Sequence, residues 1–378
     1  MSLSTFHSCV STYSEYGSIP HYPNTQIKEY KICADTLFLD SSMTSLEGQW
    51  LLCDSSLYFL DKYSVGVKQY SLDGKFISDH ITMGRGPNEM LAPAWVSTLD
   101  KNDNSFVICD QNSFIWNYRD DFNESSSTYG PWFMQLETSH SQELWDELLD
   151  NPNPDSPSMY EYNFRCKRIE CKNQNIHIPV ITEHIRYNGY DLACNAKDFW
   201  SHSAIFLRFD IGNIAGSRML LGHYPPVYQK HNIPIFSTYD FCTDEDGHII
   251  TSFSADSKIY VLDELGIPIY SFGVKGHNIS LKLPETKTFE EYEMNFDIDR
   301  QNNGYYDRLF IHNNQLLRTY HNDKEEWRMQ VYDNQILTGD ISIGKKIEII
   351  GWYDGYYYAY HSIDYDNDIF KIIKFTIQ

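Results

Sequence analysis

The chain has 378 residues, of which 42% are hydrophobic and 15% aromatic, and its formal net charge is −22. This length and apolar content are sufficient for a large core in one all-β domain, and the many Tyr, Ile, Val and Thr residues favour strands. The excess of acidic residues repels phosphate backbones and argues against nucleic-acid binding. No run of 18 apolar residues occurs, so no membrane-spanning helix is predicted.

Residues 1–26 are predicted to form a flexible N-terminal tail. The segment from Leu3 to Cys9, with the Ser/Thr/Tyr-rich stretch after it, is typical of the end of a lipoprotein signal, which would make Cys9 a lipidation site. An ordinary tail is the alternative, because a complete signal peptide is not present. The eight cysteines include no C-x-x-C pair and indicate buried small side chains rather than a metal site or a disulfide framework.

A repeated unit is the main organising feature of the chain. Each copy starts with an aromatic residue, continues through a polar turn and a β-rich run, and closes with a glycine, a span that suits two strands and a turn. The copies are Tyr70 to Gly84, Phe209 to Gly222, Tyr260 to Gly273, Tyr332 to Gly344 and, more weakly, Tyr118 to Gly130. A last β-rich unit follows at 346–378. These six units predict a six-bladed β-propeller.

The long interval between Gly130 and Gly222 is predicted to hold a short helical insertion around residues 139–150. A propeller must also close its ring, so the early β-rich segments Ile27–Tyr30 and Thr36–Leu39 are expected to pair with the terminal strand Ile369–Phe375. Residues 27–378 are therefore predicted to be a single propeller domain. A pair of β-sandwiches is the structural alternative, but it does not require six similar units.

Several short motifs resemble a known family. The sequence Gly-Arg-Gly-Pro-Asn-Glu at 84–89 is similar to the Gly-x-Gly-Pro-x-Glu signature of TolB-like six-bladed propellers, a group of bacterial envelope lipoproteins. Residues 222–225 and 303–308 are also similar to that family, and the resemblance extends over most of residues 27–378. It implies a propeller, a lipid-anchored location in the cell envelope and no established activity.

Four glycines that close a unit are followed, directly or after one residue, by a potential cation. These residues are Arg85, His223, Lys275 and Lys345. Because the links between blades cross one face, the four side chains are predicted to form a partial cationic ring that binds an anionic ligand. Solvated turn residues are the alternative. The family-like motifs add three candidate ligand-binding residues, which are Glu89, Tyr224 and Arg308.

No catalytic motif is found. A Gly-x-Ser-x-Gly elbow, a His-Glu-x-x-His helix and a Walker loop are all absent, so neither catalytic residues nor a cofactor are predicted. The acidic segments 244–247 and 364–368 begin like calcium loops but lack the glutamate expected at the twelfth position. Both are predicted to be hairpin turns without a metal.

The sequence thus favours a monomeric, non-enzymatic binding or docking propeller of the bacterial cell envelope, periplasmic or held at the outer membrane by a lipid anchor. It would recognise an anionic ligand or a protein partner on one face. The alternative is a propeller enzyme, a lyase or hydrolase acting on a glycan or lactone in the central channel. Its residues would come from several blades and leave no linear motif. A structural scaffold that joins envelope proteins is a third interpretation.

Overall fold

The computed structural model describes residues 16–64, 66–84, 89–90, 93–100, 105–110, 114–118, 133–135, 148–166, 168–172, 175–182, 184–210, 218–367 and 369–378. Strands dominate this part of the chain, and helices are few. None of the helices within it has the length and apolar character needed to cross a membrane.

The described strands form six sheets of four or five strands and one two-stranded sheet. The first sheet comprises β3 (Gly48–Cys53), β4 (Ser56–Asp61), β5 (Gly66–Ser71) and β6 (Phe76–Asp79). The second comprises β9 (Pro93–Asp100), β10 (Ser105–Asp110), β11 (Phe114–Tyr118) and β12 (Phe133–Gln135). The third comprises β13 (Glu161–Tyr162), β14 (Glu170–Lys172), β15 (Asn175–Ile181), β16 (Ala204–Asp210) and β17 (Met219–His223).

The C-terminal half of the chain supplies the other large sheets. The fourth comprises β18 (Tyr239–Thr243), β19 (Ile249–Phe253), β20 (Ile259–Leu262), β21 (Pro268–Phe272) and the early strand β1 (His21–Tyr22). The fifth comprises β22 (Tyr305–His312), β23 (Gln315–His321), β24 (Trp327–Asp333) and β25 (Ile336–Ser342). The sixth comprises β26 (Glu348–Tyr353), β27 (Tyr356–Asp364), β28 (Ile369–Ile377) and β2 (Ile32–Phe38). The short strands β7 (Thr82–Met83) and β8 (Glu89–Met90) pair with each other.

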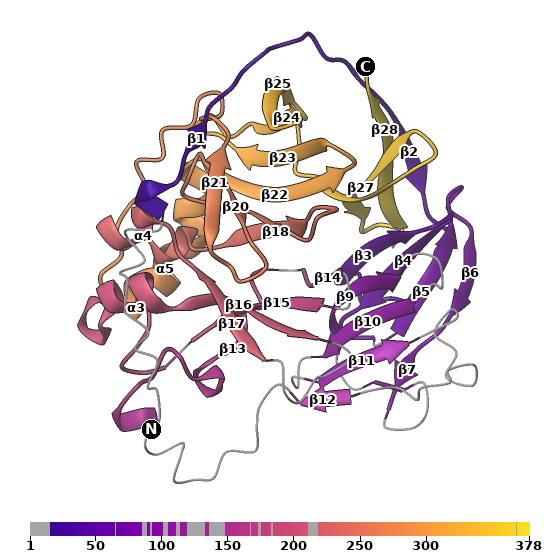
Figure 1. Cartoon of the computed structure of the whole chain (residues 1–378). Coiled ribbons are helices and arrows are strands. Elements are labelled where there is room, and N and C mark those ends of the chain that lie inside the picture. The colour runs from indigo at the N-terminus through magenta and orange to yellow at the C-terminus, as the bar shows by residue number, and fades with distance from the viewer. Residues whose placement is uncertain are drawn as a thin grey trace.

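The sheets are arranged around a common centre (Figure 1). Contacts between the inner strands run from β3 to β9, β14, β18, β22 and β26 and return from β26 to β3. A closed ring of inner strands with a twisted sheet extending outward from each is the arrangement of a propeller. The predicted all-β propeller is therefore confirmed, while the predicted number of six blades remains a prediction that is taken up below.

The repeated sequence unit corresponds to the outer hairpin of these sheets. The aromatic residues Tyr70, Phe209, Tyr260 and Tyr332 each lie in the third strand and are at most 2% exposed. The closing glycines Gly222, Gly273 and Gly344 have positive φ angles of 63°, 94° and 72°. That backbone conformation is accessible to glycine at little cost, which explains why each unit ends on this residue.

The predicted ring closure is largely confirmed. Strand β2 pairs antiparallel with β28, so that Thr36 lies opposite Ile373. The segment 27–30 lies elsewhere, because the Lys28 amide donates to the carbonyl of Thr338 on β25 at 2.8 Å. Strands from both ends of the chain thus share one sheet, which removes an exposed edge.

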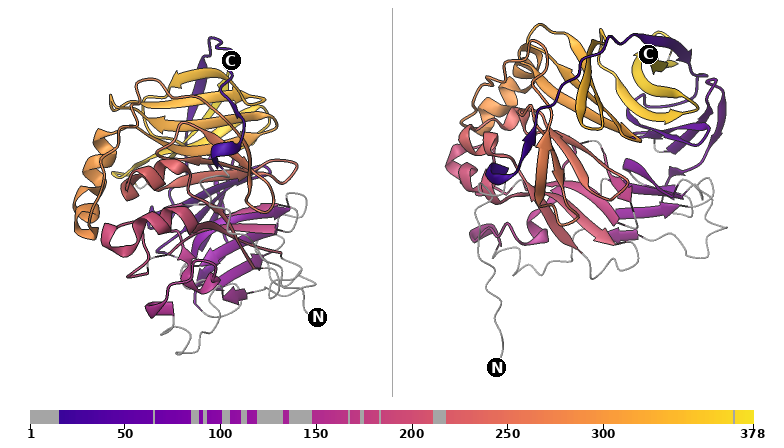
Figure 2. Two further views of the ribbon diagram at one scale, coloured as in Figure 1. Left: turned by 60° about the vertical axis from the view of Figure 1, so that its left-hand side comes forward. Right: turned by 45° about the horizontal axis from the view of Figure 1, so that its top comes forward.

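The predicted domain boundary after residue 26 is too late. Tyr16 is 4% exposed within the core, and β1 pairs in parallel with β21. Thr25 forms a bridge with Leu337 on β25, and the chain then reaches β28 through β2. The segment 20–31, here called the N-terminal strap, therefore crosses the outer edges of the fourth and fifth sheets (Figure 2).

Helices gather on one side of the molecule, around α3 (Ala196–His202), α4 (Pro226–Lys230) and α5 (Phe289–Asn302) (Figure 1). Three single 3₁₀ turns are η2 (Pro157–Met159), η3 (Leu192–Cys194) and η5 (Pro234–Phe236). Helix α5 begins at Thr288, whose hydroxyl accepts from the Glu291 amide, while the Glu291 carboxylate accepts from the Lys287 amide. The sequence analysis did not predict α5. Of the predicted insertion at 139–150, only residues 148–150 lie within the described part, and they are helical.

Candidate functional site

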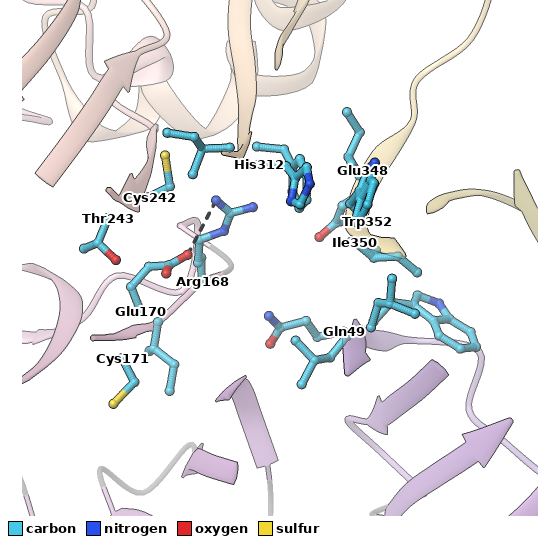
Figure 3. Close-up of a pocket in the computed structure, with 18 of the residues that line it drawn as sticks. Gln49, Arg168, Glu170, Cys171, Cys242, Thr243, His312, Glu348, Ile350 and Trp352 are labelled. Carbon is cyan, nitrogen blue, oxygen red and sulfur yellow. Dashed lines mark ion pairs between the residues drawn. The ribbon is translucent and has the colours of Figure 1, made fainter. Parts of the chain in front are cut away.

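The inner strands enclose a cavity of about 270 Å³ in the centre of the ring, here called the channel cavity. Its wall takes residues from β3, β14, β18, β22 and β26. Figure 3 shows labelled side chains from these strands around an open centre, with Arg168 paired to Glu170. The polar and aromatic side chains in the wall are Gln49, Arg168, Glu170, Thr243, His312, Glu348 and Trp352.

Charged residues are densely packed beside this cavity. The Asp240 side chain on β18 is 1% exposed, and its Oδ1 atom lies 3.6 Å from Arg168 Nε and 3.6 Å from Arg308 Nη1. Its Oδ2 atom accepts a hydrogen bond of 2.7 Å from the Leu309 amide. Arg168 also donates to the Phe241 carbonyl at 2.8 Å. One buried carboxylate therefore joins two arginines from different sheets.

A β-bulge positions the second arginine. The register between β22 and β23 shifts between Tyr306 and Leu309, so Asp307 and Arg308 lie in the irregular part of the strand. Bulges redirect side chains and are common beside functional sites. Asp307 is paired with Lys346 at 2.9 Å. The bulge thus directs Arg308 toward Asp240 on β18 and Asp307 toward Lys346 in the link before β26.

The charges of this cluster stabilise one another. Burial lowers the pKa of the Arg308 guanidinium, but the carboxylates of Glu348, Asp240 and Asp307 outweigh burial and raise it overall. Burial raises the pKa of the Asp307 carboxyl, but Lys346 and Arg308 outweigh burial and lower it. Both groups therefore stay ionised at neutral pH, as expected for buried charges with opposite charges nearby.

Glu348 differs from the other acidic residues of the cluster. Within the described part of the chain, its carboxylate has no hydrogen bond and no ion pair within 4 Å, although Arg308 lies close enough to interact electrostatically. It also lines a second cavity of about 320 Å³ between the first and sixth sheets, here called the mouth cavity. Three residues line both cavities: Gln49, Trp50 and Glu348.

The mouth cavity is rich in aromatic rings. Trp50, Phe59 and Phe370 form its buried wall, whereas Phe164 is 47% exposed and Tyr365 is 75% exposed. Tyr360 completes the wall. Burial raises the pKa of the Tyr360 hydroxyl to about 12, with smaller contributions from Tyr365 and Glu348. Its hydroxyl is therefore a neutral hydrogen-bonding group beside the Glu348 carboxylate.

The wall of the channel cavity offers no activated thiol. Cys242 is buried, and burial raises the pKa of its thiol well above the usual value. A protonated thiol is a poor nucleophile. The arrangement is instead suited to hydrogen bonding, with a carboxylate, an amide and aromatic faces converging on a small space.

The three members of the predicted ring of cations that the structure describes do not lie together. His223 is engaged at the outer strand β17, where its Nδ1 atom lies 3.2 Å from the Ser203 carbonyl and burial lowers its pKa. Lys275 lines an outer cavity beside the N-terminal strap. Lys345 is exposed and lines neither central cavity. Arg85 and the lipidation candidate Cys9 lie outside the described residues.

The three residues added by the family-like motifs have different positions. Tyr224 is buried in the aromatic cluster under α3 and α4. Glu89 lies in β8, where its carboxylate lies over Gly84. Arg308 belongs to the channel cluster. Whether any predicted residue binds a ligand stays a prediction, but Arg308 is the one whose described contacts reach the central cluster.

The sequence analysis missed Arg168, Asp240 and Glu348 as site residues. The pattern that marks two of them is a charged residue inside an otherwise apolar inner strand, as in Tyr239-Asp240-Phe241 and Ile347-Glu348-Ile349. A charge in such a position must find partners or a cavity when the strand is buried. Of the two adjacent lysines, Lys346 rather than the predicted Lys345 pairs with Asp307 of the cluster.

The acidic segment 244–247 forms a hairpin turn, as predicted. The Asp244 carboxylate accepts hydrogen bonds from the amides of Asp246 and His248 at 3.0 and 2.9 Å. Oxygen and nitrogen atoms of Asp244, Asp246 and His248 lie within 4.8 Å of one another. His248 also bonds to the Asp244 carboxylate, so the turn explains the geometry of this cluster without an ion.

Comparison with known proteins supports the fold. No family model and no curated protein matches the chain. The solved structure of a DUF4221 family member from Bacteroides vulgatus ATCC 8482 matches with a TM-score of 0.68 and 13% identity, over 93% of this chain and 99% of that one. A candidate exported protein from Bacteroides fragilis NCTC 9343 matches with a TM-score of 0.53 and 14% identity, over 96% and 100%. At this identity the likeness shows the fold alone.

Proposed function

We propose that this protein is a non-enzymatic binding propeller of the bacterial cell envelope, and that its ligand is a small molecule rich in hydrogen-bond donors, such as a sugar. The observation that carries the proposal is the Glu348 carboxylate, which lines both central cavities and has no hydrogen-bond or ion-pair partner in the described chain. Buried or half-buried carboxylates are costly unless they are hydrogen-bonded. A ligand hydroxyl or amine would supply the bond.

Sugars fit the remaining chemistry of the site. The half-exposed side chain of Trp352 stacks on His312 with ring centroids 3.9 Å apart, so the channel cavity ends in a flat aromatic surface. Gln49 adds an amide, and Arg168 and Glu170 add a donor and an acceptor. The arginines are already paired with carboxylates, which makes an anion a less favourable ligand than a neutral or cationic one.

Six blades, an envelope location, a lipid anchor and TolB-like membership belong to the same proposal. The closed ring of six inner strands and the six large sheets support six blades. The fold likeness to a candidate exported protein supports the location. Membership of the TolB-like group rests on the short motifs alone, and the anchor at Cys9 on the N-terminal sequence.

Titration calorimetry with glucose, mannose, glucosamine and N-acetylglucosamine tests the proposal. We expect at least one sugar to bind, and Glu348→Gln to weaken that binding about tenfold, because a hydrogen bond to a charged group contributes about 1.5–3 kcal/mol. Glu293→Gln is the matched control, since this exposed glutamate lies on α5 and lines neither cavity. Chromatography of each sugar after incubation tests the alternative of a lyase or hydrolase.

Three results would contradict the proposal. Binding of glucuronate or phosphate alone, with no loss in Glu348→Gln, would favour the anionic ligand that the sequence predicted. Conversion of a glycan by the wild-type protein would favour the enzyme. Equal affinities of the wild-type protein and Glu348→Gln for every sugar would remove Glu348 from the site.

A further inference from the structure

We infer that the channel cavity and the mouth cavity are two subsites of one site, and that the ligand is the end of an oligosaccharide with one sugar unit in each. This inference rests on the function proposed above. The two cavities share Gln49, Trp50 and Glu348, so a ligand that reaches the Glu348 carboxylate from one side is next to the other cavity.

The sizes of the cavities support a ligand of two units. The volumes are about 270 and 320 Å³. Pockets for small molecules usually measure about 300–1,000 Å³. The channel cavity alone is slightly below that range and the mouth cavity is at its lower end, whereas the pair is well within it. A single sugar ring would leave one of the two cavities without contacts.

The chemistry of the mouth cavity matches a sugar unit in a chain. Phe164 and Tyr365 expose about half or more of their side chains at its rim, which gives flat apolar faces for the C–H side of a ring. Exposed Glu47 and half-buried Lys62 lie at the same rim and can bond to hydroxyl groups. Glu47 and Lys62 do not form an ion pair with each other.

The open rim indicates how the chain would leave the protein. Tyr365 lies in the turn between β27 and β28 and is 75% exposed. The wall of the channel cavity comes from strands of five sheets, whereas the wall of the mouth cavity comes from the first and sixth sheets and from Phe164, which follows β13. The terminal unit would therefore occupy the channel cavity, and the next unit would occupy the mouth cavity with the rest of the chain in solvent.

The experiment compares N-acetylglucosamine, glucose and mannose with their β-1,4- or α-linked dimers and tetramers by titration calorimetry. For the sugar that binds, we expect the dimer to bind at least about threefold more tightly than the monomer, because an aromatic contact contributes about 0.5–1.5 kcal/mol beyond burial. The tetramer should bind about as tightly as the dimer.

Two variants locate the second subsite. Tyr365→Ala should remove the advantage of the dimer and leave the affinity for the monomer unchanged, whereas Trp352→Phe should weaken both. Phe38→Ala is the matched control, because Phe38 is 59% exposed on β2 and lines neither cavity. All three positions are at least a third exposed, so the variants should fold.

The outcomes separate this inference from the function beneath it. If the monomer binds but the dimer binds no more tightly, or if Tyr365→Ala keeps the full advantage of the dimer, the two-subsite inference is wrong and the channel site stands. If no sugar of any length binds the wild-type protein, both are wrong. Binding of choline in place of the sugars would instead indicate an aromatic cage for organic cations.

Discussion

Two arginines on neighbouring strands of the fifth sheet, Arg318 on β23 and Arg308 on β22, are used differently, although the first is buried and the side chain of the second is only 13% exposed. Arg318 is 0% exposed, and its guanidinium lies 3.8 Å over the ring of Tyr306. It donates to the Gln330 side chain, to the carbonyls of Ser257 and Val274 and to the Tyr332 hydroxyl at distances between 2.6 and 3.2 Å. Every nitrogen of its guanidinium is hydrogen-bonded.

The positive charge of Arg308 is stabilised mainly by nearby carboxylates rather than by hydrogen bonds. Its Nε atom has no hydrogen-bond partner within the described chain, and its contact with Asp240 is 3.6 Å long. The surrounding carboxylates come from β18, β22 and β26. A guanidinium with all donors used holds a structure together, whereas Arg308 keeps one buried donor, its Nε atom, without a hydrogen bond in the described chain and interacts with the Glu348 carboxylate that lines both cavities.

The largest effect is expected for Arg318→Met. The substitution removes the bonds between the fifth sheet and the loops of the fourth. It leaves the carbonyl of Ser257 without its donor, whereas the carbonyl of Val274 keeps the Gln330 side-chain amide at 3.2 Å. Each buried group left unpaired costs about 1–3 kcal/mol, so we expect the free energy of unfolding to fall by about 3–4 kcal/mol. Urea denaturation followed by circular dichroism measures the loss.

Arg318→Lys sharpens this test. A lysine keeps the positive charge but has one donor nitrogen in place of a planar fork, so it cannot reach both the Gln330 side chain and the two carbonyls. Its stability should lie between those of the wild-type protein and Arg318→Met. A loss below about 1 kcal/mol in Arg318→Met would show that the bonds of Arg318 do not stabilise the fold.

A buried histidine contrasts with these arginines, because it stays uncharged where they stay charged. His177 on β15 is 4% exposed, and within the described residues neither ring nitrogen has a hydrogen-bond partner. Burial, with a smaller contribution from Arg208, lowers the pKa of His177 to about 4 from an ordinary value of 6.5. The imidazole is therefore neutral in the folded protein at pH 7.

Acidification should weaken the fold through His177. Because its pKa is lower in the folded state, the unfolded chain binds the proton first, so stability is full above pH 6.5 and declines as pH falls toward 4. Between pH 7 and 5 we expect a loss of about 2 kcal/mol from this residue. His177→Leu should lack this part of the loss, as measured by urea denaturation at both pH values. The same pH dependence in both proteins would assign the effect to other groups.

Local patterns in the sequence were sufficient for the fold. The aromatic residue and the glycine of each unit, such as Tyr260 and Gly273, lie within one hairpin, so their spacing shows the hairpin directly. The pairing of β2 with β28 followed from the need to close a ring. Helix α5 was missed although the Thr288-x-x-Glu291 capping box marks its start in the sequence. The N-terminal strap was missed because its pairing with β21 and β25 joins segments far apart in the chain.

The site could be predicted only in part, because it is assembled over long distances in the chain. Arg168, Asp240, Arg308 and Glu348 come from four different sheets or links, and no spacing rule relates them. The neighbouring lysines show the same limit: Lys345 lies in a bend after Gly344 and both Lys345 and Lys346 are exposed, so strand alternation could not indicate that Lys346 pairs with Asp307.

The comparison of the two arginines is tested most directly by Arg308→Met, for which the smallest loss of stability is expected. Asp240 would keep Arg168 as its ion-pair partner and the Leu309 amide as its hydrogen-bond donor, so its charge would not be left alone. We expect a loss of about 1–2 kcal/mol, less than half of that in Arg318→Met. Sugar affinity should fall by more than the stability loss suggests, because Glu348 would lose its electrostatic interaction with Arg308. If Arg308→Met instead unfolded as readily as Arg318→Met and bound the sugar normally when folded, Arg308 would be a second structural arginine, and the spare donor at Nε would have no part in binding.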